Sequence, residues 1–160
     1  MKKKNLCIRI ANIGDIEEIL VLEKQVYEIH SKARPDWINK FSLNYNYIEG
    51  LLQNNNNKIF LAEENGKIIG FCIINIREIK EHHLFHDVKI IEIDDICIDQ
   101  KCRKRGIGKL FFEEAKRLTK EINAKFIELI VWEFNQDAIK FYEKMGMKTK
   151  TRRMEYKIEK

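Results

Sequence analysis

The chain has 160 residues, of which 44% are hydrophobic, so it is long enough to bury one core and short for several domains. The formal net charge is +5, and residues 101–109 alone carry five cations and no acid, so the remaining residues sum to zero. The basic charge is therefore a local feature, and no apolar run is long enough to cross a membrane.

The cysteines indicate a reducing environment. Cys7, Cys72, Cys97 and Cys102 show no CxxC spacing, and three of them lie in strand-like apolar runs, where a free cysteine acts as a small buried hydrophobe. We expect a cytoplasmic protein without disulfides. The N-terminal Met-Lys-Lys-Lys is not followed by the apolar segment of a signal peptide.

Hydrophobic periodicity predicts the elements in chain order. Strands are expected at residues 6–10, 59–62, 68–76, 89–98, 126–132 and 148–158. Helices are expected from residue 12 or 14 to 30 and at 44–53, 107–121 and 135–144. Asn65-Gly66 predicts a tight hairpin between the second and third strands. This order predicts an α/β (α+β) fold in a single domain over residues 1–160, with a mixed, mostly antiparallel sheet of about six to seven strands flanked by helices.

The most informative stretch is residues 94–112, where a strand pattern changes to a helix pattern at Gly106 and Gly108. Glycines let backbone N–H groups face outward, and the first N–H groups of a helix lack internal partners at its positive end. Four cations surround this point, at Arg103, Lys104, Arg105 and Lys109. The stretch predicts a phosphate or pyrophosphate site. The alternative is that the glycines only shape a loop.

Two well-known phosphate loops do not match this stretch. A Walker loop needs four residues between its first glycine and Gly-Lys, and Gly106 is too close to Gly108-Lys109. A dinucleotide fingerprint needs a third glycine at the position that Phe111 occupies.

A different pair of motifs does match. Residues 103–108 read Arg-x-x-Gly-x-Gly after Ile96-Cys97-Ile98, and residues 131–147 contain Asn, then Ala-x-x-Phe-Tyr-x-x-x-Gly. Together these motifs resemble the GNAT superfamily of acetyl-CoA-dependent N-acetyltransferases. The similarity covers residues 58–158 well and the first 57 more loosely, and Met147 stands where the family usually has Phe.

The resemblance implies a GNAT-like fold that binds acetyl-CoA as cosubstrate and needs no metal. Backbone groups of Ile96, Cys97 and Ile98 would meet the pantetheine arm in the manner of an added strand. The remaining residues implied to bind the coenzyme are Arg103, Lys104, Arg105, Gly106, Ile107, Gly108, Lys109 and Asn135.

The resemblance also implies catalytic roles. Tyr142 stands where the family places its general acid, and the alternative is a core aromatic beside Phe141. Glu92 stands where some members carry a glutamate base. Asp94 and Asp95 are rivals for that role, or would bind a cationic acceptor.

Two further details bear on the base. Strand alternation places Glu92, Asp94, Ile96 and Ile98 on one face. Ile130 stands where ribosomal-protein alanine acetyltransferases carry a glutamate, which argues against their base and their substrate.

The acceptor region is expected between the first two helices. His30 and Trp37, with Asp94, are predicted to contact the acceptor, although a packed loop is the simpler interpretation. His82, His83 and His86 are interpreted as a solvated loop rather than a metal site.

The predicted function is direct acetyl transfer to a primary amine, of a small molecule or a peptide, in a ternary complex. The alternative is a non-catalytic acyl-CoA sensor. Nucleic acid is disfavoured, since no aromatic residues are interleaved with the cations. Many relatives pair, so a homodimer is compatible with the resemblance.

Overall fold

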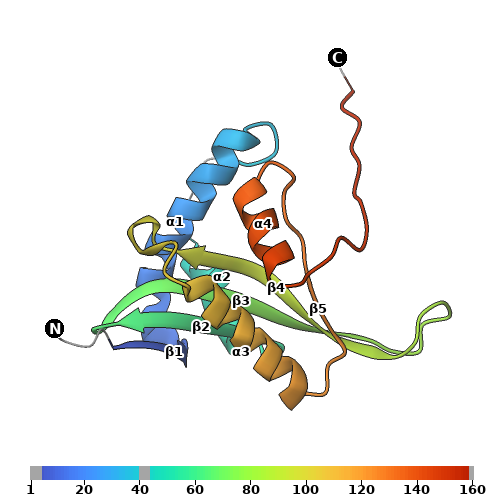
Figure 1. Ribbon diagram of the computed structural model, residues 1–160, viewed down its shortest axis with the longest axis horizontal. Coiled ribbons are helices and arrows are strands. Elements are labelled where there is room, and N and C mark those ends of the chain that lie inside the picture. The colour runs from blue at the N-terminus through green and yellow to red at the C-terminus, as the bar shows by residue number, and fades with distance from the viewer. Residues whose placement is uncertain (1–4, 40–43, 159–160) are drawn as a thin grey trace. The chain divides into compact units, whose positions relative to one another are not determined.

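The structure is a computed structural model that describes residues 5–39 and 44–158 (Figure 1). The predicted absence of a signal peptide rests partly on residues 1–4, which lie outside the described part. The chain divides into two compact units, Met1–Ile130 and Val131–Lys160, and each is described by itself.

The first unit contains a five-stranded sheet in the order β1-β2-β3-β4-β5. All neighbours are antiparallel except β4 and β5, which are parallel. Its elements are β1 (Leu6–Ile10), the 3-10 turn η1 (Ile13–Asp15), α1 (Ile16–Ala33), α2 (Tyr45–Gln53), β2 (Asn57–Glu64), β3 (Lys67–Ile79), β4 (Val88–Ile98), the 3-10 turn η2 (Gln100–Cys102), α3 (Ile107–Glu121) and β5 (Phe126–Leu129).

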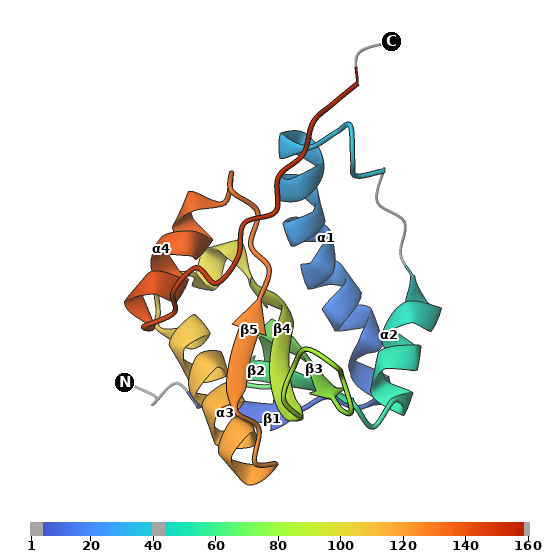
Figure 2. The same ribbon diagram turned by 90° about the vertical axis from the view of Figure 1, so that its right-hand side faces the viewer.

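Helices cover both faces of this sheet (Figure 2), with α1 and α2 on one face and α3 on the other. The chain enters α1 through Asn12, whose side chain accepts a hydrogen bond from the N–H of Gly14 while Asp15 accepts from the N–H of Asn12. This reciprocal capping satisfies the first N–H groups of the turn. Helix α1 then continues to Ala33, three residues beyond the predicted end at His30.

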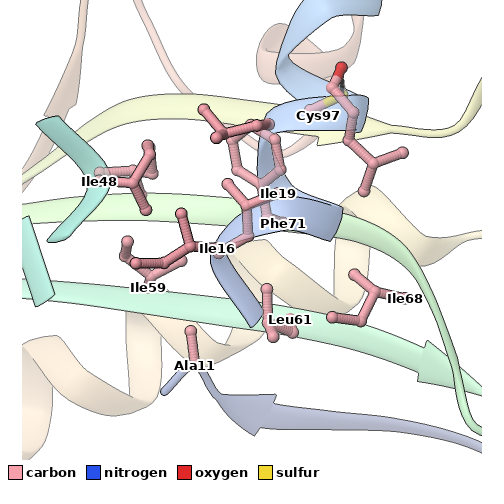
Figure 3. Close-up of a cluster of buried hydrophobic side chains, with 12 residues drawn as sticks. Ala11, Ile16, Ile19, Ile48, Ile59, Leu61, Ile68, Phe71 and Cys97 are labelled. Atoms are coloured by element: carbon pink, nitrogen blue, oxygen red, sulfur yellow. Dashed lines mark hydrogen bonds between the residues drawn. The ribbon is translucent and has the colours of Figure 1, made fainter. Parts of the chain in front are cut away.

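The core between α1, α2 and the sheet is apolar (Figure 3). Ile16 and Ile19 of α1 are fully buried against Leu61 of β2 and Phe71 of β3. Burying a side chain of this size contributes about 1.5–3 kcal/mol. Helical spacing on α1 and alternation on the strands thus produce one core, as the periodicity predicted.

The hairpin between β2 and β3 is confirmed. Asn65 and Gly66 have φ values of 53° and 78°, the left-handed conformation that a two-residue turn of this kind requires at both positions. Glycine and asparagine tolerate that conformation better than other residues.

A β-bulge interrupts β4. Asp95 pairs with Ile73 of β3, but Ile93 pairs with Ile74, so Asp94 is an extra residue in β4. Ile73 belongs to the core under α1, and directly opposed residues share a sheet face. Asp95 therefore faces α1 and α2.

The bulge overturns one expectation. Glu92 pairs with Asn75, which shares the face of Ile73, whereas Ile96 pairs with Cys72 on the opposite face. The prediction that Glu92, Asp94, Ile96 and Ile98 share one face is wrong, because the extra residue shifts the alternation. Glu92 and Asp95 instead share the face that α1 and α2 cover.

The second unit contains α4 (Gln136–Lys144). The side chain of Asn135 accepts a hydrogen bond from the N–H of Ala138 at 3.3 Å, which confirms the predicted cap. Gly146 has a φ of 91° and ends the helix as predicted.

The predicted last strand at 148–158 is wrong. Within the described residues, 148–158 contain no strand, and Met154, Tyr156 and Ile158 are 90%, 88% and 74% exposed. Their alternation suits a strand, but a strand also needs a partner for its backbone groups. The sheet thus has five strands rather than six to seven, while the α/β fold class with a mostly antiparallel sheet is confirmed.

Candidate active site

The turn before α3 has the geometry of an anion site. Gly106 caps the helix with a φ of 83°, and Lys104 also has a positive φ of 60°. Ile107 and Gly108 are buried and fix the first turn of α3 against the unit's core. The N–H groups of that first turn, which have no partner within the helix, therefore lie at a defined position beside exposed cations.

The four cations of this turn differ in their contacts. Arg103 donates from Nε to the carbonyl oxygen of Ile98 at 3.1 Å. Arg105 forms an ion pair with Glu64 at the end of β2, and that hydrogen bond raises the pKa of the Arg105 guanidinium. Lys104 and Lys109 are exposed.

Strand β4 extends beyond its parallel partner. Strand β5 pairs with β4 only from Ile90 to Ile93, whereas β4 continues to Ile98. The predicted pantetheine-binding residues Ile96, Cys97 and Ile98 lie in this extension. Their pairing with β3 is retained, so only the side of β4 that faces β5 is available for an extended ligand.

The side chain of Cys97 points away from that side. Its thiol donates to the carbonyl oxygen of Leu22 on α1 at 3.2 Å, and burial raises the pKa of the thiol. A buried thiol of raised pKa is a poor nucleophile, because the thiolate is the reactive form.

Acidic side chains of α1 and β4 lie near one another on the sheet face that α1 and α2 cover. Burial, together with the charges of Glu23 on α1 and of Asp94, raises the pKa of Asp95 to about 7, although a backbone hydrogen bond with Ile96 opposes the shift. Burial also raises the pKa of Glu23 and of Asp94. Carboxyls in this setting remain protonated to higher pH.

The phenol of Tyr47 on α2 belongs to the same region. Burial raises its pKa, and the charges of Asp94, Glu23 and Asp95 add to the shift. Ionisable side chains of α1, α2 and β4 thus interact electrostatically near the bulge of β4.

Glu92 is engaged in an ion pair. Arg77 of β3 approaches Glu92 at 3.3 Å through Nε and Glu128 of β5 at 3.1 Å through Nη2. The guanidinium therefore bridges two carboxylates on neighbouring parallel strands.

The predicted acceptor residues lie on three elements. His30 is half-buried near the end of α1, and burial lowers the pKa of its imidazole. Trp37 is 63% exposed, with the guanidinium of Arg34 5.8 Å from the ring centroid. Asp94 lies at the bulge of β4.

Three residues near the site escaped sequence reasoning: Glu23, Tyr47 and Glu64. Glu23 follows Ile16 and Ile19 at helical spacing, so its position on the apolar side of α1 was a usable signal. The contact of Glu64 with Arg105 spans 41 positions of sequence and had no local signal.

His82, His83 and His86 lie in the exposed loop between β3 and β4, where the rings of His82 and His83 stack at 4.7 Å. In residues 5–39 and 44–158, no group of three or more His, Cys, Asp or Glu side chains is arranged to hold a metal ion. Over the same ranges no helix combines the length and the apolar character needed to cross a membrane.

The remaining predicted residues lie in the second unit. Asn135 is the N-cap of α4, and Tyr142 lies on that helix with its ring edge-on to Phe141, the centroids 5.2 Å apart. Tyr142 therefore has the aromatic neighbour that a packing role would require. Its role as general acid stays a prediction.

The acetyltransferase (GNAT) family profile matches residues 23–147, and the chain belongs to this family. It is 27% identical over 150 residues to an uncharacterized N-acetyltransferase, MJ1207, of Methanocaldococcus jannaschii, covering 92% of this chain. The chain spans only 62% of that relative's length.

Solved structures share the fold of this chain. The BH1408 protein of Bacillus halodurans, studied as a tetramutant, is 30% identical with a TM-score of 0.92, covering 95% of this chain and 99% of that one. The aminoglycoside N-acetyltransferase AAC(6')-Iy, solved with CoA, shares the fold at 19% identity with a TM-score of 0.78, covering 98% of this chain and 97% of that one.

Proposed function

We propose that this chain is an acetyl-CoA-dependent N-acetyltransferase acting on a primary amine, within one domain over residues 1–160. The observation that carries the proposal is the turn before α3, where Gly106 and Lys104 adopt positive φ and exposed cations surround the first N–H groups of the helix, which have no partner within the helix itself. The family match supports a single domain, because residues 23–147 extend across both compact units.

The residues present fit this cosubstrate. A phosphate suits the start of α3, and the backbone of residues 96–98 suits an extended amide-containing arm on the side that β5 leaves unpaired. The relative AAC(6')-Iy was solved with CoA, which supports the same ligand here. Acetyl-CoA, when bound, supplies the thioester that donates the acetyl group.

The attacking amine must lose a proton. Glu92 is the base predicted from sequence, and Arg77 contacts it at 3.3 Å. Asp95 is the alternative base, and one observation favours it. Its carboxyl lies on the sheet face that α1 and α2 cover, and its pKa of about 7 suits a base acting near neutral pH. Asp94, between them, would bind a cationic amine.

Tyr142 would donate a proton to the leaving sulfur. A phenol of ordinary pKa near 10 protonates a thiolate of ordinary pKa near 8.5 only when the two are held together, so position decides the role. The mechanism is proposed to be direct transfer in a ternary complex. The burial of Cys72 and Cys97, which raises the pKa of both thiols, supports it, because neither is a ready nucleophile.

The acceptor is proposed to be the amine of a small molecule or a peptide. Aminoglycoside acetyltransferases among the fold relatives act on amines, which supports the small-molecule class. His30 and Trp37 are proposed to contact this acceptor. A homodimer, a cytoplasmic location and the absence of a metal requirement stay predictions.

The test combines binding with turnover. Calorimetry is expected to show uptake of CoA and acetyl-CoA, and release of free thiol is expected when acetyl-CoA is incubated with one member of an amine panel. Uptake without turnover across the panel would favour the acyl-CoA sensor. No uptake at millimolar CoA by folded protein would overturn the proposal.

A further inference from the structure

The ion pair between Glu64 and Arg105 links β2 to the turn that precedes α3. Glu64 is the last residue of β2, and Arg105 is the residue before the helix-capping Gly106. The side chain of Glu64 is only 12% exposed and that of Arg105 is 30% exposed. A largely buried carboxylate that accepts from a guanidinium forms a stronger contact than a pair in open solvent.

The alternation of side chains along β2 directs Glu64 toward this turn. Ile59 and Leu61 of β2 belong to the core under α1, so Glu63 lies on that face and Glu64 on the opposite face, the one that α3 covers. Glu63 accordingly binds Arg9 at 2.6 Å. Two adjacent glutamates thus hold two different arginines on opposite faces of one strand.

Side-chain contacts of the residues before and after Lys104 hold the turn in place. Arg103 donates to the carbonyl oxygen of Ile98, and Arg105 is bound by Glu64. Between them Lys104 has a positive φ of 60°, which is uncommon for a residue with a side chain and persists only where the surroundings hold it. Within the described residues, the side chain of Lys104 forms no ion pair or hydrogen bond.

We propose that Glu64 is a positioning residue of the coenzyme site: through Arg105 it holds the turn that presents Lys104 and the N–H groups of α3 to the phosphates. The inference rests on the proposed function. It divides the cations of the turn into two groups. Arg103 and Arg105 maintain its conformation, whereas Lys104 and Lys109 contact the ligand.

Two opposite effects of Glu64 on CoA binding are physically conceivable. Its charge neutralises Arg105 and would weaken an anion site, while its hydrogen bond preorganises the turn and would strengthen the site. The buried carboxylate and the left-handed Lys104 favour preorganisation.

The experiment measures the Kd of CoA by calorimetry for Glu64→Gln, with Glu63→Gln as the matched control. Glu64→Gln is expected to weaken CoA binding about tenfold, the order expected for one charged hydrogen bond. Turnover at saturating acetyl-CoA is expected to remain near that of the unmodified protein. Glu63→Gln, which loses an ion pair on the other face, is expected to leave the Kd unchanged.

A double variant separates the ion pair from general damage. If Glu64 acts through Arg105, then Glu64→Gln/Arg105→Gln binds CoA no more weakly than either single variant. Its affinity should also retain the salt dependence of the unmodified protein, because the two removed charges cancel. Lys104→Gln is expected to reduce that salt dependence, and Lys120→Gln at the far end of α3 is not.

The outcomes are distinct. Tighter or unchanged CoA binding by Glu64→Gln overturns the inference, as does additive weakening in the double variant. Failure of the unmodified protein to bind CoA would instead overturn the proposed function.

Discussion

Gly70 of β3 lies so close to Cys97 of β4 that a Cβ at position 70 would stand 2.8 Å from the carbonyl oxygen of Cys97. The same Cβ would lie 3.3 Å from the ring of Phe111 on α3. A backbone oxygen cannot rotate away as a side chain can. The missing side chain at Gly70 therefore allows two strands and a helix to meet just before the turn that precedes α3.

Replacing Gly70 with alanine is expected to destabilise the protein by about 1–3 kcal/mol, because the strands or α3 must shift. CoA affinity should fall as well, since β4 leads directly into the turn. Thermal melting and calorimetry measure both effects. Gly50→Ala is the control, since its Cβ would meet nothing within 4 Å in α2 and a helical alanine stabilises by up to about 1 kcal/mol. Equal melting temperatures for the two variants would contradict the close approach.

Asp95→Asn is expected to change how stability depends on pH. The folded pKa of Asp95 is about 7 against an ordinary value of 3.8, so between these values the folded state keeps a proton that the unfolded state loses. Stability therefore falls as the pH rises through this window. The asparagine variant should be more stable than the unmodified protein at pH 8, by at least about 1 kcal/mol, and similar at pH 4.

Urea unfolding at pH 4, 6 and 8 measures this difference. Glu23 and Asp94 are shifted in the same direction, so the variant should retain part of the pH dependence. Glu113→Gln, which removes an exposed carboxylate on α3, is the control and should show no such trend. A constant difference between Asp95→Asn and the unmodified protein at every pH would refute the assigned shift.

Features that depend on neighbouring residues were predictable from sequence. Asn65-Gly66 encodes a turn because both residues tolerate positive φ, and Asn135 encodes a cap because its side chain reaches the N–H three residues on. The change of periodicity at Gly106 likewise marked the start of α3. Each signal is contained within a few positions of the chain.

Features that depend on register were not predictable in this way. The bulge at Asp94 is defined by which residues of β3 lie opposite, and one extra residue placed Asp95, rather than Asp94, on the face of Glu92 toward α1. The contact of Glu64 with Arg105 likewise depends on which face of β2 each glutamate occupies. At 148–158 the alternation was present, but the partner that a strand needs is not encoded in the segment itself.

The two proposed bases predict different pH profiles of kcat/KM. The burial of Asp95 leads us to expect that activity rises with pH through about 7 and that Asp95→Asn removes this rise. The loss of rate should be about 10²–10⁴-fold, the usual contribution of a general base. Glu92→Gln should keep the rise near pH 7. If the rise near pH 7 persisted in Asp95→Asn and disappeared in Glu92→Gln, the general base would be Glu92.

Tyr142→Phe is expected to lower turnover without weakening coenzyme binding. The substitution removes only the phenolic hydroxyl and retains the ring that packs edge-on against Phe141, so α4 should stay folded. If the hydroxyl protonates the leaving thiolate, kcat should fall by about 10²–10⁴-fold while the Kd of CoA remains similar. Tyr156→Phe, at a tyrosine that is 88% exposed in the same unit, is the matched control and should be fully active. Thiol release under saturating acetyl-CoA and amine measures both variants. Unchanged turnover in Tyr142→Phe would leave the side chain a packing role and would require another donor for the thiolate.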